Sequence, residues 1–197
     1  MSHHQYHTDA FILGSIPVGE SNRYIDLFTA DLGRVRAFAR SVRTERSKLR
    51  LSLQDFSLTE VSLVRGKELW RVVGARLKHS VHYDISNHCG ERDTILRLFR
   101  LIKRLLNGEE ENKPLFGTFF HALSFLRGNT LSEDETHNFE CLIALRILYN
   151  LGYLAKDKSN IHFLDTSDVN KELISLLSPI RYDMVRQINV SLQESQL

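Results

Sequence analysis

The first eighty residues alternate short β-prone runs with turn signals. Within the runs, apolar and polar positions alternate with a period of two, which is typical of strands that bury one face. Gly33 and Gly66 lie between runs, where we expect turns that need a positive φ. Five strands in about seventy residues predict a small Greek-key barrel, the OB-fold. The runs interpreted as strands are Thr8–Ile16, Arg23–Ala30, Arg34–Val42, Phe56–Val64 and Glu68–Lys78.

Beyond residue 90 the apolar positions recur at helical spacing. One apolar stripe runs over residues 91–106 and a second over residues 114–127. Ser132 and Glu135 have the spacing of a capping box and predict the start of a third helix that reaches Leu151. This helix is apolar on most sides, so we expect it at the centre of a bundle.

Two shorter helices are expected near the end of the chain, over Val169–Leu177 and from Ser178-Pro179 onward. The predicted fold class is therefore α+β. We expect a five-stranded OB-fold domain over residues 1–80 and an α-helical bundle domain over residues 81–197.

Composition narrows the classes of protein. Apolar residues make up 42% and charged residues 25% of the chain, enough for a globular core. No apolar run is long enough to span a membrane, and the polar start Met1–His7 lacks the apolar stretch of a secretory signal. Cys89 and Cys141 form no CxxC pair. We expect a cytoplasmic protein.

Positive charge is concentrated in the first half. The net charge is only +2, but residues 1–80 carry thirteen Lys or Arg against eight Asp or Glu, a local charge of +5. Residues 34–50 hold seven of these cations and one acid, Glu45.

This basic segment predicts a nucleic-acid surface. In a strand, Arg34, Arg36, Phe38 and Arg40 share one face, and the small residues between them face the core. Guanidinium groups bind phosphate, and an aromatic ring can stack on a base. Phe38 could equally pack against the helical domain. The predicted DNA-binding residues are Arg23, Arg34, Arg36, Phe38, Arg40, Arg43, Arg46, Lys48 and Arg50.

Other patterns favour structural roles. We interpret Trp70, placed on the strand face of Arg76 and Lys78, as a core or interface residue rather than a base-stacking platform. Glu109–Glu111 is interpreted as a solvated loop, and Glu133–Glu135 as acids that complement a helix dipole.

Catalytic motifs are absent, so we expect no enzymatic activity. There is no phosphate loop, GxGxxG, HExxH or GxSxG motif, and Asp26 and Asp31 are too few for a nuclease metal site. We also expect no cofactor and no metal. One cluster contains zinc-ligand types, but its spacing fits no established site: His79, His82, His88 and Cys89.

The sequence resembles the bacterial recombination mediator family RecO. The resemblance is specific up to about Phe56 and weaker in the helical half. It rests on Thr8–Leu13, Gly19–Arg23, Leu27–Thr29, Leu32–Arg40, Ser47–Leu49, Leu53–Leu58, Phe139–Tyr153 and the tail Ile188–Leu197.

The resemblance implies an OB-fold joined to a helical domain, in a nucleoid-associated bacterial protein. It also implies binding to single- and double-stranded DNA, strand annealing, and RecA loading onto strands coated by single-stranded DNA-binding protein (SSB). The implied partners are RecR and the acidic SSB tail. Many members carry a four-cysteine zinc module after the Leu-Gly-Tyr ending, whereas residues 154–169 contain no cysteine. We therefore expect no structural zinc.

Two functional hypotheses stay open. The first is a DNA-repair mediator whose helical half docks an SSB tail through Arg97, Arg100, Lys103, Arg104 and Arg146, although a solvated basic face is the favoured interpretation of these residues. The second is an interaction adaptor whose basic OB surface binds an acidic protein.

Overall fold

A computed structural model describes residues 4–81 and 89–194. The chain divides into two compact units. The first comprises Met1–Asp84 together with Asn107–Asn112, and the second comprises Ile85–Leu106 and Lys113–Leu197. The short segment 107–112 thus belongs with the first unit, although the residues on both sides of it belong with the second.

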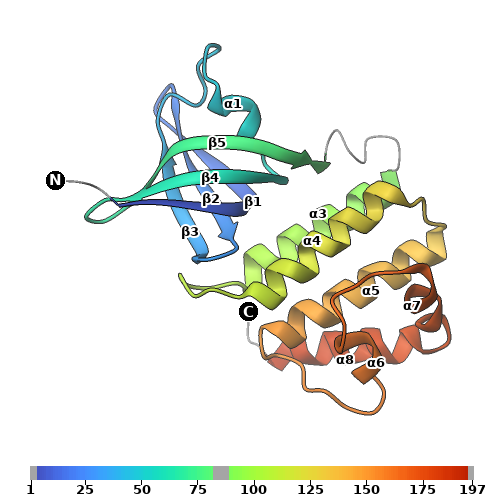
Figure 1. Ribbon diagram of the computed structural model, residues 1–197. Coiled ribbons are helices and arrows are strands. Elements are labelled where there is room, and N and C mark those ends of the chain that lie inside the picture. The colour runs from blue at the N-terminus through green and yellow to red at the C-terminus, as the bar shows by residue number, and fades with distance from the viewer. Residues whose placement is uncertain (1–3, 82–88, 195–197) are drawn as a thin grey trace. The chain divides into compact units, whose positions relative to one another are not determined.

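The first unit is a five-stranded barrel (Figure 1). Its strands are ordered β1-β2-β3-β5-β4, and β4 pairs back onto β1 to close the sheet. The predicted OB-fold and α+β class are confirmed. All pairings are antiparallel except β3–β5, which is parallel. The strands are β1 (Gln5–Val18), β2 (Asn22–Thr29), β3 (Gly33–Ala39), β4 (Ser57–Arg65) and β5 (Trp70–Ser80), with the short helix α1 (Leu49–Ser52) between β3 and β4.

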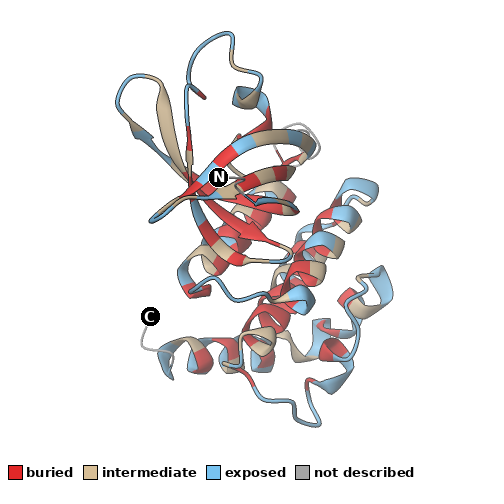
Figure 2. Ribbon diagram, turned by 60° about the vertical axis from the view of Figure 1, so that its left-hand side comes forward, coloured by how far each residue is buried: buried red, intermediate tan, exposed pale blue. Residues whose placement is uncertain are grey.

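The period-two pattern explains the barrel core. In β3, Val35, Ala37 and Ala39 are fully buried in one cluster, and the residues between them are exposed or half-buried. Figure 2 shows buried positions within the strands and exposed positions in the loops that join them. The predicted alternation of β3 is therefore confirmed. The inward-facing residues are small because a five-stranded barrel has a narrow interior.

A β-bulge corrects the face predicted for Trp70. The register shifts in β5 so that Ser62 pairs with Gly74 and Leu63 with Val72, which leaves Val73 unpaired. A bulge reverses the alternation beyond it. Trp70 is therefore buried in the core, whereas Arg76 and Lys78 are exposed on the outside.

The prediction of a positive φ at Gly66 is also wrong, whereas Gly33 has a φ of 66° as expected. Gly66 serves a close approach instead. A Cβ there would lie 2.7 Å from the Leu69 carbonyl oxygen, to which the Gly66 N–H donates a hydrogen bond.

The second unit is a helical bundle around one central helix. Ser132 and Glu135 form the predicted capping box at the start of α5, which packs against α3, α4, α6, α7 and α8. The four-residue α6 follows the Lys156–Asn160 stretch and is too short to leave a periodic signal. The helices are α3 (Cys89–Leu105), α4 (Lys113–Gly128), α5 (Glu133–Asn150), α6 (Ile161–Leu164), α7 (Lys171–Leu176) and α8 (Arg181–Glu194), with a 3₁₀ turn at Ser178–Ile180.

None of the helices within residues 4–81 and 89–194 has the length and apolar character needed to cross a membrane.

Candidate nucleic-acid interface

Four residues form a continuous row across the outer face of the barrel. Ile16 on β1 pairs with Tyr24 on β2, Tyr24 pairs with Phe38 on β3, and Phe38 pairs with Arg71 on β5. Their neighbours Ile25, Ala37 and Trp70 face the core, so these four side chains face outward. We call Ile16, Tyr24, Phe38 and Arg71 the outer-face row.

The middle of this row carries two aromatic rings in contact. The Tyr24 and Phe38 rings meet edge to face, with centroids 5.6 Å apart, and both residues are half-buried. Such a pair is held in a defined orientation by its quadrupole interaction. The rings therefore offer a pre-arranged apolar platform on the barrel surface.

A groove of about 600 Å³ lies over this platform. Tyr24, Phe38, Leu69 and Val72 contribute its apolar part, and the two exposed arginines Arg40 and Arg71 contribute its charge. No carboxylate is among the described residues that line it. The groove thus combines aromatic surface with unneutralised guanidinium groups, which is the combination that binds single-stranded nucleic acid.

Two of the predicted arginines are not equivalent to Arg40. Asp26 lies opposite Arg36 on the neighbouring strand. Arg36 Nε donates to Asp26 Oδ1 at 2.7 Å, and Arg34 Nη2 lies 3.9 Å from Asp26 Oδ2. The hydrogen bond that Arg36 donates to Asp26 raises the pKa of Arg36. The three arginines predicted on one face of this strand therefore differ in their surroundings, because a carboxylate on the neighbouring strand lies beside Arg34 and Arg36.

Arg23 lies on the other side of β2 from the outer-face row. It alternates with Tyr24, shares the parity of core-facing Ile25, and donates from Nη1 to Ser15 Oγ at 3.3 Å. The cations after β3 lie in the segment that leads into α1, where Arg43 donates to the Gly19 carbonyl oxygen at 3.0 Å. The remaining predicted cations are exposed: Arg46 and Lys48 in this segment, and Arg50 within α1.

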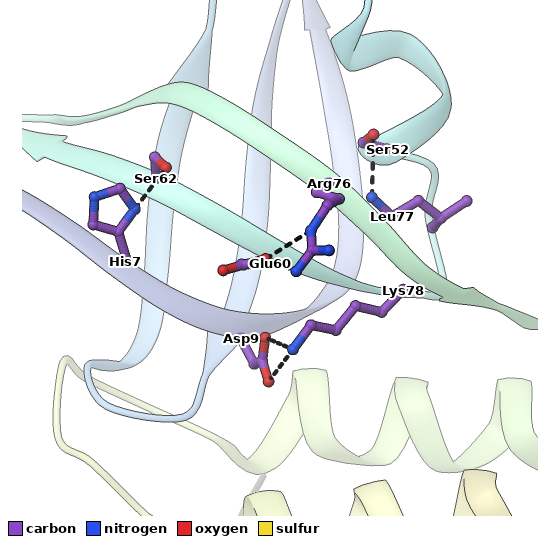
Figure 3. Close-up of polar contacts among 8 residues, drawn as sticks. All are labelled: His7, Asp9, Ser52, Glu60, Ser62, Arg76, Leu77 and Lys78. Carbon is purple, nitrogen blue, oxygen red and sulfur yellow. Dashed lines mark hydrogen bonds and ion pairs between the residues drawn. The ribbon is translucent and has the colours of Figure 1, made fainter.

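A second outer surface of the barrel is charged but internally paired (Figure 3). Glu60 on β4 accepts from Arg76 Nε on β5 at 2.9 Å, and Asp9 on β1 accepts from Lys78 Nζ at 2.8 Å. The hydrogen bond from Arg76 lowers the pKa of Glu60. Because each cation here faces a carboxylate, this surface attracts a phosphate backbone less than the groove does.

The helical candidates also differ from one another in their contacts and exposure. Arg97 makes a two-pronged pair with Glu140 on α5, with both N–O distances 2.6 Å, and this pairing raises its pKa. Arg100 and Arg104 are exposed on α3, and Lys103 is half-buried.

Arg146 is removed from the predicted docking surface by burial. Only 2% of the residue is exposed, and its guanidinium donates to the backbone oxygens of Phe163, Ser167 and Asp168 at 2.7, 3.1 and 3.0 Å. Burial lowers its pKa to about 10. Arg146 holds the segment after α5 onto that helix, a role that its position on an otherwise apolar helix could have indicated.

Among the residues that the structure describes, no group of three His, Cys, Asp or Glu side chains is placed to hold a metal ion. Two members of the histidine–cysteine cluster, His82 and His88, lie outside the described residues.

Sequence reasoning missed most of the groove. The sequence prediction gives no site role to the lining residue Tyr24 and counts Arg71 only among cations that widen the basic surface. The alternation of residues 23–30 placed Tyr24 outward, which was a usable signal. The strand register that aligns Tyr24 with Phe38 could not be derived from that alternation alone.

Comparisons with known proteins agree with this architecture. Residues 1–81 match the family model "Recombination protein O N terminal". The chain is 42% identical over 150 residues to the DNA repair protein RecO of Dehalococcoides mccartyi strain 195, covering 76% of this chain and 57% of that protein. It is 33% identical over 145 residues to the DNA repair protein RecO of Enterobacter sp. strain 638, covering 73% and 59%.

The chain thus spans a little over half the length of these relatives. The match includes the whole barrel and continues into the helical unit. The chain therefore belongs to the RecO family.

Proposed function

We propose that this protein is a DNA-repair and recombination mediator that binds DNA through the groove over the outer-face row and catalyses no reaction itself. Arg40 and Arg71 contact phosphates, and Tyr24 and Phe38 stack on unpaired bases. Each phosphate contact releases counterions, so the affinity falls as salt rises. Single strands bind through phosphates and bases, whereas duplexes bind through phosphates alone.

The observation that carries this proposal is the register of the outer-face row. Four strands bring two contacting rings and an arginine into one line, beside Arg40 and away from any lining carboxylate. An ordinary solvated strand has no need of two aromatic rings on its exposed face, since such surface is costly to leave in water.

Strand annealing follows from the same chemistry. A strand whose phosphates are neutralised repels a complementary strand less, and bases held on a sequence-tolerant platform stay available for exchange. As the family resemblance implies, we extend the proposal to RecA loading on SSB-coated DNA, with RecR and the SSB tail as partners. The exposed cations of α3, Arg100 and Arg104, support docking of an acidic tail.

The test is a titration of a labelled single strand, followed by fluorescence anisotropy at about 50 and 200 mM salt. Phe38→Ala removes one stacking ring and should weaken single-strand binding by about 1–3 kcal/mol, with less effect on duplex binding. If the unchanged protein binds no DNA at low salt but binds an acidic protein, the adaptor function replaces the mediator function.

A further inference from the structure

The barrel is joined across its narrowest seam by only two residue pairs. Strands β3 and β5 pair at Ala37–Trp70 and Phe38–Arg71, and the earlier part of β3 has no partner in β5. These two pairs also place Phe38 and Arg71 next to each other in the groove. Whatever holds this seam closed therefore sets the geometry of the groove.

The loop 107–112 lies against this seam. Arg34 donates its backbone N–H to the Gly108 carbonyl oxygen at 3.0 Å, at the part of β3 that β5 does not reach. Gly33, with a φ of 66°, comes so close to the loop that a Cβ there would overlap the Glu110 backbone. The loop thus occupies the strand edge that β5 leaves open.

Glu109 fixes the loop to the first residue of β5. Its Oε1 accepts from the indole Nε1 of Trp70 at 2.9 Å, and its Oε2 lies 3.7 Å from Arg65 Nη2. The Arg65 guanidinium lies over the Trp70 ring, 5.3 Å from its centroid. Trp70 is only 4% exposed, so its buried indole N–H would lose this hydrogen bond if Glu109 left. Glu109–Glu111 are exposed, as expected for a solvated run, but Glu109 in addition makes these two contacts.

We infer that Glu109 is a positioning residue for nucleic-acid binding: by holding Trp70, it fixes the β3–β5 pairing that aligns Phe38 with Arg71. Glu109 is not among the described residues that line the groove, and its polar contacts are with Trp70 and Arg65. The DNA-binding part of this inference rests on the proposed function.

The test separates the effect of removing the Glu109 charge from the effect of losing its contact with Trp70. Glu109→Ala removes a negative charge from a DNA-binding barrel, so electrostatics alone should strengthen binding. If Glu109 positions Trp70, the substitution should instead weaken single-strand binding. Loss of the β3–β5 pairing in half of the molecules would lower the apparent affinity about twofold. The matched control is Glu110→Ala, which removes the same charge from an exposed side chain of the same loop.

A second readout does not depend on DNA. Trp70 is the single tryptophan of the chain, so its emission reports the seam. We expect Glu109→Ala, and not Glu110→Ala, to shift the emission to longer wavelength and to speed hydrogen exchange of the Arg34 amide. Glu109→Gln keeps an acceptor for the indole and should leave the emission unchanged, which guards against a general folding defect.

The outcomes separate the two proposals. Equal effects of Glu109→Ala and Glu110→Ala on emission and exchange overturn the inference, whether or not the protein binds DNA. A shift in emission with unchanged DNA affinity overturns the coupling to the groove. If the unchanged protein binds no DNA, the proposed function fails, and emission and exchange alone decide whether Glu109 holds the seam.

Discussion

The two charged surfaces of the barrel allow a charge-matched test of where DNA binds. The double change Arg40→Gln with Arg71→Gln removes two cations from the groove, where no carboxylate is among the described lining residues. The double change Arg76→Gln with Lys78→Gln removes two cations that are paired with carboxylates on the other surface. Both variants lose the same net charge, so a difference between them reports position and not total charge.

The size of the effect follows from counterion release. Each phosphate contact to a single strand contributes about 0.7 to the slope of log affinity against log salt, so losing two contacts flattens the slope by about 1.4. Over a fourfold rise in salt, the unchanged protein should lose about sevenfold more affinity than the groove variant does. The control variant should keep a slope close to that of the unchanged protein.

Fluorescence anisotropy with a labelled single strand, repeated over a salt series, measures these slopes. Thermal unfolding of each variant verifies that the barrel is intact. If the Arg76–Lys78 variant loses as much slope as the Arg40–Arg71 variant, binding follows the general charge of the barrel, and the assignment of the groove is refuted.

Three further predictions concern stability and reactivity. Arg146→Met leaves three backbone carbonyl oxygens without their buried donor and should lower the free energy of unfolding in urea by about 3 kcal/mol or more; a loss below about 1 kcal/mol would contradict its role. Gly19→Ala should lower the free energy of unfolding by about 1–2 kcal/mol, because alanine is strained at a positive φ. Gly33→Ala should lower it more, because its Cβ would also overlap the Glu110 backbone. Thermal melts measure both losses, and equal losses would refute the contact with Glu110. Burial raises the pKa of Cys141 from 9.0 to about 12. The thiol therefore deprotonates at lower pH in the unfolded chain than in the folded one, so stability should fall as pH rises above 9. Cys141→Ala should remove that part of the loss, which urea unfolding over a pH series measures. An unchanged pH profile would show that the thiol does not contribute.

Cross-strand neighbours account for the main errors at the candidate site. The sequence prediction of β3 considered one strand alone, and there Arg34, Arg36 and Arg40 are equivalent. In the barrel, the register sets Asp26 beside the first two and leaves Arg40 at a groove without a carboxylate among its described lining residues. Similarly, Arg146 was grouped with surface cations because helical spacing does not show which carbonyl groups a guanidinium will reach.

The local patterns were sufficient for the elements themselves. Alternation in β3 determined which residues fill the barrel, and the capping box with a dense apolar run determined that α5 lies at the centre of its bundle. These properties depend on a repeat of two or 3.6 residues, which the sequence carries directly. Tertiary structure alone decided the features that depend on register and on distant segments. The bulge at Val73 turned Trp70 inward, strand pairing aligned Tyr24 with Phe38, and a loop some forty residues beyond Trp70 in the chain supplied its hydrogen-bond partner. Such contacts form only when the chain closes on itself, so no local pattern can encode them.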